Sequence, residues 1–421
     1  MNCMEYINKK YKPLKDDLIC EYYIEPNGIS MEEAAENVAK ESSIGTWTDI
    51  STMNPCIAAK LRPTVFSITK DKIKIAYPSD LFEAGNMPQI LSSIAGNIFG
   101  MKLLKNLKLL DIKFPPRILR SFKGPAFGVA GIRKLTKIRN RPLTGTIVKP
   151  KVGLSAKQHA EVAYKAWIGG LDIVKDDENL SSMRFNTFED RIRETLRARE
   201  KAMEETGEFK VYMPNITAET DEMIRRADLV KQCGGDYIMI DILTAGFAAL
   251  QTIRNLDLGM VIHAHRAGHA AITRNPKHGV SMLALAKIAR LIGVDQLHIG
   301  TIVGKMDGSK VEIQEIEDEI EDSFVTKGKT HALEQRWTGI KPVLAVCSGG
   351  LHPGHLPKLI KYMGSNIVCQ FGGGCHGHPD GTEPGARAIR QALDATLKKK
   401  KLEVYAKGFP ELARALQKFE H

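Results

Sequence analysis

Gly169-Gly-Leu-Asp-Ile-Val-Lys-Asp-Asp-Glu-Asn179 is a short apolar strand that ends abruptly in one basic and three acidic residues. Alternate positions of a strand share a face, and neighbouring positions point apart. Lys175 and Asp177 therefore face one way, and Glu178 can turn toward them from the loop that follows. The simplest alternative is a charged strand-to-helix loop that carries a helix N-cap.

Two carboxylates at the end of a strand suit a hard cation such as Mg²⁺, which prefers oxygen ligands. A lysine beside them would oppose the cation unless its charge were removed or inverted. A carbamate, formed when CO₂ adds to the amine of Lys175, is an anionic oxygen ligand and resolves this contradiction. The motif thus predicts a magnesium site built from Lys175, Asp177 and Glu178.

Strand patterns and helix patterns alternate through most of the chain, from about residue 143 onward. Apolar strand candidates alternate there with segments of helical period, as in a (β/α)8 TIM barrel. A doubly wound open sheet is the alternative, but it more often stops at about five or six strands. The strand candidates are residues 144–149, 171–175, 210–215, 237–242, 260–265, 295–301, 342–348 and 367–371.

The residues before this region mix strands and helices without a regular repeat, which is an α+β pattern. We predict a smaller α+β domain over residues 1–135 and a (β/α)8 barrel catalytic domain with C-terminal helices over residues 136–421. Within the first domain, the pattern predicts strands over residues 18–24 and 65–75, and helices over residues 31–40 and 87–104.

The composition is that of a globular protein, with 43% hydrophobic and 26% charged residues in a chain of 421. The net charge is +11, yet Lys and Arg are dispersed, and the only tight run, Lys398–Lys401, is predicted to be a solvated face late in a helix. Aromatic residues make up 6% and do not interleave with the basic ones, so no nucleic-acid partner is expected. The basic balance suits a polyanionic small substrate such as a bisphosphate.

The cysteines and the N-terminal sequence indicate the cellular compartment in which we expect the protein. Seven cysteines without a Cys-x-x-Cys pair support neither a disulfide framework nor a zinc knuckle. The N-terminus lacks an apolar signal core, and no apolar run approaches membrane-spanning length. We therefore expect a cytoplasmic protein without a membrane partner.

Reactive side chains gather where the predicted strands end, which is where TIM-barrel enzymes hold their active sites. Lys149 and Lys151 flank a proline and are either surface charges or a clamp for phosphate or enolate oxygens. His263 and His265 match the zinc pair of barrel hydrolases, which makes a zinc enzyme the main competing interpretation.

Glycine runs follow the last two predicted strands, at residues 349–350, directly after Ser348, and at residues 372–374. They can be plain turns, but backbone N–H groups exposed at strand ends also bind phosphate. With Arg266 and His298 opposite them, they indicate a substrate with two phosphates. The loop 300–305 resembles a P-loop but is one residue short and lacks the required Ser or Thr, so we interpret it as a glycine-hinged lid.

Taken together, these motifs resemble the large chain of ribulose-1,5-bisphosphate carboxylase/oxygenase (Rubisco), over nearly the whole chain. The resemblance rests on residues 169–179, Lys149-Pro-Lys151, His263-Ala-His-Arg-Ala267, Gly304-Lys305, Ser348-Gly-Gly350, Gly372-Gly-Gly374, Glu41-Ser-Ser-Ile-Gly-Thr-Trp-Thr48 and Gly96-Asn-Ile-Phe-Gly100.

The resemblance implies an enzyme that carboxylates ribulose 1,5-bisphosphate to two 3-phosphoglycerate, with competing oxygenation by O₂. Lys175 would take up a non-substrate CO₂ as a carbamate and hold Mg²⁺ with Asp177 and Glu178. The carbamate would remove the C3 proton of the sugar to give a Mg²⁺-stabilised enediolate.

The resemblance also assigns roles to residues around this centre. Lys149 would shuttle protons with support from Lys151, and His265 would assist hydration of the six-carbon intermediate. Lys305 on the lid would polarise the attacking CO₂, and Glu41 would pair with Lys305 on closure.

The substrate phosphates are expected at two places. One phosphate would contact Arg266, His298 and Ser348. The other phosphate would contact Gly350, Gly372, Gly373, Thr46 and Trp47, and Gly349 and Asn97 are also expected to line the substrate site. In the family the N-terminal residues reach the barrel of a neighbouring subunit, so a homodimer or a multimer of dimers is expected.

Departures from the plant enzymes point to a subtype. Ile147 and Ile299 replace a Thr and a Ser of the plant enzymes, and the chain is shorter. These features resemble the archaeal form III enzymes, which work without a small subunit and take their substrate from the breakdown of AMP and other nucleoside monophosphates.

Two alternatives stay open at this point. A Rubisco-like enolase or isomerase of sulfur salvage would keep the carbamate site but usually lose the lid lysine, which is present here. A zinc-dependent barrel hydrolase would hold its metal at His263 and His265.

Overall fold

The structure is a computed structural model that describes residues 6–48, 50–304, 310–328 and 333–419. It divides into two compact units. The first unit contains residues 1–124, 268–292 and 322–340, and the second contains residues 125–267, 293–321 and 341–421. The predicted domain boundary at residue 135 stays a prediction.

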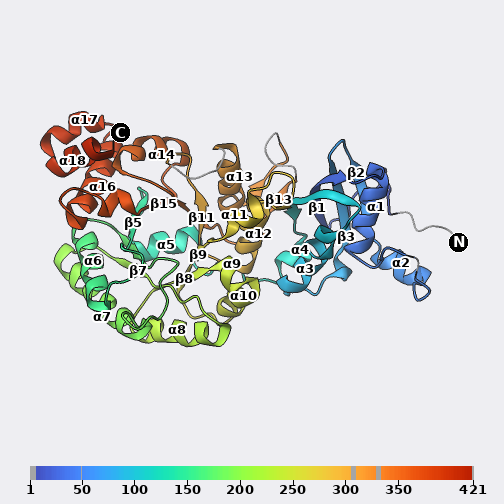
Figure 1. The fold of residues 1–421 in the computed structure, drawn as a ribbon, viewed down its shortest axis with the longest axis horizontal. Coiled ribbons are helices and arrows are strands. Elements are labelled where there is room, and N and C mark those ends of the chain that lie inside the picture. Colours follow the sequence, from blue (N-terminus) through green and yellow to red (C-terminus); the bar gives the residue numbers. More distant parts are fainter. Residues whose placement is uncertain (1–5, 49, 305–309, 329–332, 420–421) are drawn as a thin grey trace. The chain divides into compact units, whose positions relative to one another are not determined.

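The second unit is built on eight parallel strands (Figure 1). Their order around the sheet follows their order along the chain. The last strand pairs with the first, and a bridge between Asn215 and Met239 links the third to the fourth, so the sheet closes on itself. The strands are β5 (Leu143–Ile147), β6 (Ile173–Lys175), β7 (Val211–Met213), β8 (Tyr237–Asp241), β9 (Val261–His265), β11 (Gln296–Gly300), β14 (Leu344–Ser348) and β15 (Ile367–Phe371). The predicted TIM barrel is confirmed, and the open sheet is excluded.

The inside of the barrel is filled by alternate strand residues, as a strand period of two requires. Ile173 of β6, Val346 of β14 and Val368 of β15 are fully buried in one apolar cluster, which also contains Ile132. Ile132 belongs to helix α5 (Gly128–Thr136), which precedes the first barrel strand. Because side chains fill the middle of the barrel, a ligand cavity can open only at its ends.

Helices surround the barrel strands (Figure 1). Helix α6 begins with a capping box, in which Ser155 accepts from the Gln158 N–H and the Gln158 side chain accepts from the Ser155 N–H. The helices of this unit are α5, α6 (Ala156–Ile168), α7 (Phe188–Thr206), α8 (Thr220–Gln232), α9 (Ile242–Ala245), α10 (Phe247–Asn255), α13 (Lys310–Glu321), α14 (Leu356–Met363), α15 (Gly373–His376), α16 (Thr382–Leu397), α17 (Leu402–Tyr405) and α18 (Pro410–Phe419).

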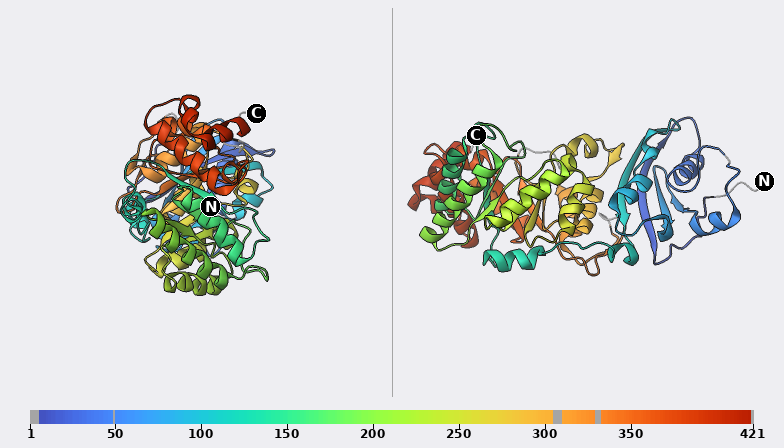
Figure 2. Two further views of the ribbon diagram at one scale, coloured as in Figure 1. Left: turned by 90° about the vertical axis from the view of Figure 1, so that its left-hand side faces the viewer. Right: turned by 90° about the horizontal axis from the view of Figure 1, so that it is seen from below.

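The first unit contains a five-stranded sheet in the order β10-β4-β1-β3-β2, antiparallel except for the β10–β4 pair. Helix α1 lies against this sheet (Figure 2). Its buried residues are alanines and a valine. The elements are β1 (Asp17–Pro26), β2 (Thr64–Ile68), β3 (Lys72–Pro78), β4 (Leu104–Lys113), β10 (Gly279–Val280), β12 (Phe324–Val325), β13 (Gln335–Arg336), α1 (Met31–Glu41), α2 (Pro55–Leu61), α3 (Met87–Ile94), α4 (Pro116–Leu119), α11 (His269–Thr273) and α12 (Met282–Ile292).

Two segments from later in the chain complete this first unit. Lys287 of α12 makes a buried ion pair with Asp111 of β4, with 2.7 Å between Nζ and Oδ1. Leu333 packs in a small apolar cluster with Ile19 of β1 and Ala76 of β3. The structure thus confirms an α+β unit, built from three stretches of sequence.

Two predictions within this unit were wrong. The strand predicted over residues 65–75 is a hairpin of β2 and β3, because the polar Thr69 and Asp71 form a turn, in which the Thr69 N–H donates to the Lys72 carbonyl. The helix predicted over residues 87–104 ends at Ile94. The backbone of Gly96, two residues later, packs against the carbonyl oxygen of Ser92. A Cβ at position 96 would lie 2.1 Å from that oxygen, so only glycine fits there.

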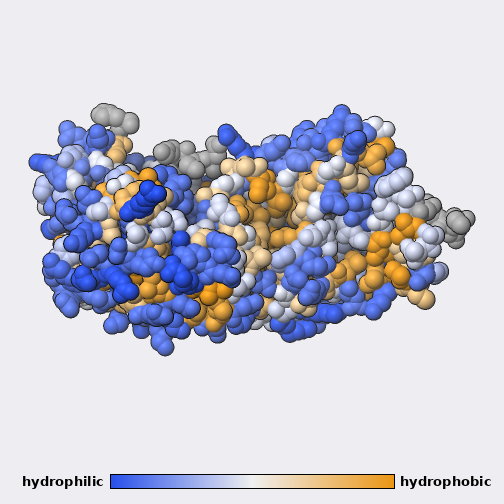
Figure 3. Space-filling view, turned by 60° about the horizontal axis from the view of Figure 1, so that its bottom comes forward, coloured by the Kyte–Doolittle hydropathy of each residue, from blue (hydrophilic) through white to orange (hydrophobic). Residues whose placement is uncertain are grey.

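The surface mixes hydrophilic residues with apolar patches (Figure 3). Trp47 of the first unit is 86% exposed, which is unusual for so large an apolar side chain. Among the described residues, no helix combines the length and apolar character that a membrane span needs.

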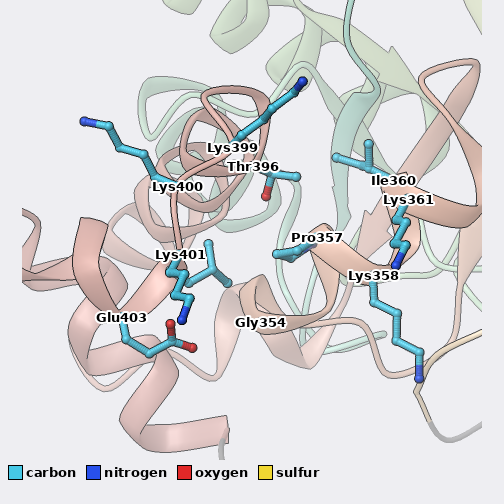
Figure 4. A pocket seen from close by; sticks show the side chains of 11 residues that line it. Gly354, Pro357, Lys358, Ile360, Lys361, Thr396, Lys399, Lys400, Lys401 and Glu403 are labelled. Carbon is cyan, nitrogen blue, oxygen red and sulfur yellow. The ribbon is translucent and has the colours of Figure 1, made fainter.

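The lysine run near the C-terminus is exposed, as predicted, but it follows helix α16 rather than lying in it. With Lys358 and Lys361 of α14, residues of this run line a hollow of about 1000 Å³. Lys399 and Lys400 point away from the middle of the hollow (Figure 4). Because these ammonium groups diverge into solvent, the run is a solvated surface.

Candidate active site

A cavity of about 490 Å³ opens at the C-terminal ends of the barrel strands. Six of the eight strands, or the residues directly after them, contribute to it. The lining residues are Ile147, Lys149, Lys151, Lys175, Asp177, Glu178, His265, His298, Ser348, Gly349, Gly350, Leu351, His352, Gln370, Gly372, Gly373, Gly374 and Phe419. Most of the residues predicted to form the site in the barrel therefore meet in one place.

Lys175 is the last residue of β6 and is 1% exposed. Its Nζ donates to the Asp176 carbonyl at 2.7 Å and lies 3.1 Å from the Met239 sulfur. Burial lowers the pKa of Lys175 to about 8, although the nearby carboxylates of Glu178 and Asp177 act in the opposite direction. A neutral amine, which is the nucleophilic form of lysine, is therefore accessible near neutral pH.

Two carboxylates stand beside this amine and are paired with lysines. Lys149 Nζ lies 2.5 Å from Asp177 Oδ2, and Lys151 Nζ lies 3.5 Å from Glu178 Oε1. Burial alone would raise the pKa of Glu178, but His265, Lys175 and Lys151 outweigh it and hold the pKa at about 2. Glu178 is therefore a carboxylate at neutral pH, ready to bind a cation.

Asp177, Glu178 and Lys175 fit Mg²⁺ if the amine of Lys175 is converted to a carbamate. The described residues contain no group of three or more His, Cys, Asp or Glu side chains able to hold a metal ion. Asp177 and Glu178 supply only two anionic side chains, and Lys175 is the next group beside them. A carboxylated Lys175 would add the third anionic oxygen ligand that a hard cation favours.

The histidine pair does not fit zinc. Both ring nitrogens of His263 have partners, since Nδ1 lies 2.8 Å from Gln296 Oε1 and Nε2 lies 2.9 Å from His298 Nε2. Burial lowers the pKa of His263 to about 3, so the ring is neutral and fully hydrogen-bonded. With no free nitrogen on His263, the zinc-hydrolase interpretation loses its metal site.

His265 faces the carboxylates instead. Its Nε2 lies 3.7 Å from Glu178 Oε2, and its Nδ1 lies 3.5 Å from Asp241 Oδ1. An imidazole held between two carboxylates at the cavity wall can accept or deliver a proton there.

The two glycine runs also line the cavity. Gly349 and Gly350 follow β14 with φ angles of 118° and 80°, values that favour glycine. Ser348 Oγ lies 2.8 Å from His298 Nδ1, so these two predicted phosphate contacts are joined. Gly372 lies directly after β15, against the side chain of Lys149.

Arg266 lies at the edge of this region, next to Gly300 at the end of β11. A Cβ on Gly300 would come within 2.9 Å of Arg266 Nη2, so the guanidinium occupies the space that glycine leaves. Burial lowers the pKa of Arg266 to about 10, and it remains a cation at neutral pH. Arg266 is not among the residues that line the cavity.

Five predicted site residues lie outside the described part of the barrel unit. Lys305 lies outside the described residues. Glu41 ends α1 of the first unit, and the other three predicted contacts from that unit are Thr46, Trp47 and Asn97. Their roles stay predictions.

The structure adds lining residues that the sequence patterns missed. Gln370 of β15 is buried, and among the described residues its side-chain amide has no hydrogen-bond partner. A polar residue at an inward position of an otherwise apolar strand was the available signal. Phe419 of α18 stacks on His352 with 5.4 Å between ring centroids, and no local pattern reveals such a contact.

Comparison with known families decides the identity. The family model of the ribulose bisphosphate carboxylase large chain, catalytic domain, matches residues 128–419, and the model of its N-terminal domain matches residues 5–118. The chain belongs to the Rubisco large-chain family. The resemblance found in the sequence is thereby confirmed.

Relatives and solved structures agree. The ribulose bisphosphate carboxylase of Methanosarcina barkeri is 53% identical and that of Methanocaldococcus jannaschii is 52% identical, with 98% or more of each chain covered. An octameric Rubisco from Pyrococcus horikoshii OT3 superposes with a TM-score of 0.92 at 50% identity, covering 99% of this chain and 96% of its own. A dimeric archaeal Rubisco from Hyperthermus butylicus gives 0.93 at 46% identity, covering 99% of both chains.

Proposed function

We propose that this protein carboxylates ribulose 1,5-bisphosphate to two molecules of 3-phosphoglycerate, with oxygenation as a competing reaction. The observation that carries the proposal is the meeting of Lys175, Asp177 and Glu178 with Lys149 and His265 in one cavity. The family membership and the names of the relatives support the same reaction.

Activation is proposed to begin at Lys175. Its lowered pKa provides a neutral amine whose nitrogen can bond to the carbon of CO₂. The amine then releases one proton to solvent, and the product is an anionic carbamate next to Asp177 and Glu178. These three residues would then hold Mg²⁺. When bound, Mg²⁺ supplies Lewis-acid polarisation of the substrate oxygens.

The activation rate should depend on pH in a way that reports this buried lysine. Because burial lowers the pKa of Lys175 to about 8, the neutral fraction grows as the pH rises toward 8 and saturates above it. At pH 7 about a tenth of the lysine would be neutral, against about one part in 3000 for an ordinary lysine of pKa near 10.5. We expect the rate of activation, measured at constant dissolved CO₂, to level off above about pH 9. A rate that continues to climb through pH 10 would contradict the assignment.

The other residues of the cavity would position the substrate and move protons. Lys149 would exchange protons with the substrate, with support from Lys151, and His265 would exchange a proton at the carboxylate side. The proximity of Lys149 to Asp177 and of His265 to Glu178 supports these roles. One phosphate would bind at Arg266, His298 and Ser348. The other would bind at Gly350, Gly372 and Gly373, with Thr46 and Trp47.

His298 plays a particular part in this scheme. Burial and the neighbouring His265 and His263 lower the pKa of His298 well below its ordinary value, so the ring is neutral. Its contribution to phosphate binding is therefore the orientation of the Ser348 hydroxyl rather than a positive charge.

We further propose that the active form is a homodimer or a multimer of dimers without a small subunit. Glu41, Thr46, Trp47 and Asn97 would complete the cavity of the partner subunit. The exposure of Trp47 supports this, because a large apolar side chain left in water is a common mark of an interface. The dimeric and octameric forms of the structural relatives are in line with it.

Mixing two inactive variants should test the shared site. A Glu41→Gln chain and a Lys175→Ala chain each lack one half of every site in their homodimers. A heterodimer would hold one site with both halves intact. With random exchange, half of the dimers are mixed, so recovery should approach about a quarter of wild-type activity. Complete subunit exchange without recovered activity would mean that each site is built within a single chain.

The isoleucines at positions 147 and 299 support a place among the form III enzymes. The substrate would then come from the breakdown of AMP and other nucleoside monophosphates.

The direct test of the reaction uses ribulose 1,5-bisphosphate, Mg²⁺ and labelled bicarbonate. Labelled 3-phosphoglycerate is the expected product. A Rubisco-like enolase or isomerase would leave bicarbonate unincorporated, and that result would overturn the proposal.

A further inference from the structure

Asp176 is a buried charge for which the reaction has no direct use. It lies between Lys175 and Asp177, but it points away from the cavity, as the alternation of a strand requires. Its exposure is 0%. A carboxylate removed from water is strongly unfavourable unless it is paired and hydrogen-bonded, so its retention needs a reason.

Four groups surround this carboxylate. Oδ1 accepts a hydrogen bond from the Tyr212 hydroxyl at 2.7 Å and lies 3.1 Å from His159 Nε2. Oδ2 accepts from Arg191 Nε at 3.1 Å and from the backbone N–H of Asn215 at 3.0 Å. Burial alone would raise the pKa of Asp176, but Arg191 and His159 hold it far below its ordinary value. Asp176 therefore stays ionised and cannot serve as a proton donor at working pH.

The partners of Asp176 also hold the loop that carries the proposed metal ligands. Arg191 Nη1 donates to the Ser181 carbonyl at 2.8 Å and to the Asn186 carbonyl at 3.3 Å. The Asn215 side-chain amide donates to the carbonyls of Glu178 at 3.2 Å and Leu180 at 3.1 Å. The loop after β6 is thus fixed at its start, its middle and its end.

The same contacts determine where Lys175 stands. Its Nζ donates to the Asp176 carbonyl, so the peptide that Asp176 anchors also orients the amine. Any movement of Asp176 would displace a proposed ligand on each side of it in the chain.

We infer that Asp176, Arg191, Tyr212 and Asn215 form a positioning anchor, which fixes Lys175, Asp177 and Glu178 in the geometry needed to capture CO₂ and Mg²⁺. The inference rests on the proposed function, since it explains how that site is assembled. The four residues are positioning residues, because none of them lines the cavity.

The test compares two buried carboxylates at opposite ends of β6. Asp176→Asn removes the anchor's charge at nearly constant volume, and Tyr212→Phe removes one donor only. Asp172→Asn is the matched control, because Asp172 is equally buried and pairs with Arg141 at 2.6 and 2.7 Å, but it precedes the strand.

The readout is the carbamate carbon signal in a ¹³C NMR spectrum, recorded with labelled bicarbonate while Mg²⁺ is titrated, without ribulose bisphosphate. Losing an outer partner of a metal site commonly weakens metal binding by about 10–100-fold. We expect Asp176→Asn and Tyr212→Phe to raise the half-saturating Mg²⁺ concentration by that factor. Asp172→Asn should lower the melting temperature but leave the Mg²⁺ titration at the wild-type position.

Two results would contradict the role of the anchor. Equal shifts for Asp172→Asn and Asp176→Asn, or no shift for either anchor variant, would overturn the inference. If Asp176→Asn does not fold, Tyr212→Phe decides alone. Absence of a carbamate signal from the wild-type protein would contradict the proposed function itself, which separates that failure from failure of the anchor.

Discussion

Replacement of Lys175 by alanine is expected to reduce carboxylation by at least about a thousandfold, which corresponds to about 4 kcal/mol of transition-state stabilisation. The two carboxylates that remain, Asp177 and Glu178, are too few to hold a hard cation in the cavity. Wild-type enzyme kept free of CO₂ should be inactive at first and should gain activity after preincubation with CO₂ and Mg²⁺. The measurement is the initial rate of labelled 3-phosphoglycerate formation.

A matched lysine separates this effect from general damage. Lys165 of α6 is exposed and pairs with Glu161 at 2.7 Å, and exposed pairs of this kind contribute about 0–1 kcal/mol. Lys165→Ala should keep wild-type activity. Full turnover by Lys175→Ala, or by protein never exposed to CO₂, would refute the carbamate proposal.

Much of the barrel could be predicted from the sequence because its strands are short, apolar and regularly followed by helices. The position of polar residues at the C-terminal ends of the predicted strands then placed Lys149, Lys175, His265 and Ser348 at one end of the barrel, where the structure brings them together. This inference needs only the parallel direction of the strands.

Features that depend on tertiary contacts could not be found in the same way. Phe419 reaches the cavity from the last helix, and nothing in its local sequence indicates that neighbour. His263 looked like a zinc ligand because a motif does not show whether its nitrogens are already bonded to Gln296 and His298. The strand alternation indicates that Asp176 points away from Lys175, but the partners that hold it come from distant segments.

The first unit was predicted less well, for a physical reason. Its elements do not repeat, so each boundary depends on local turn chemistry alone. The polar turn at Thr69 and the close approach of Gly96 to Ser92 ended a strand and a helix that the apolar pattern would have continued.

Replacement of Lys305 by alanine is expected to stop carboxylation but to leave enolisation largely intact. By the family resemblance, the lid lysine would act on the carboxylate that develops when CO₂ adds, after the C3 proton has left. A charge that interacts mainly with the second transition state should affect mainly the second step. Exchange of the C3 proton with solvent should persist, while 3-phosphoglycerate formation falls by about two to three orders of magnitude.

The two rates must be measured on the same preparation, with C3-deuterated ribulose bisphosphate followed by NMR and labelled bicarbonate followed into product. Lys310 begins α13, its Nζ lies 3.5 Å from the centroid of the Tyr362 ring, and Lys310→Ala provides the control for losing a lysine near the lid. That control should retain both rates. If Lys305→Ala lost exchange and carboxylation equally, its ammonium group would be needed for substrate binding or enolisation, and the assignment to CO₂ addition would be wrong.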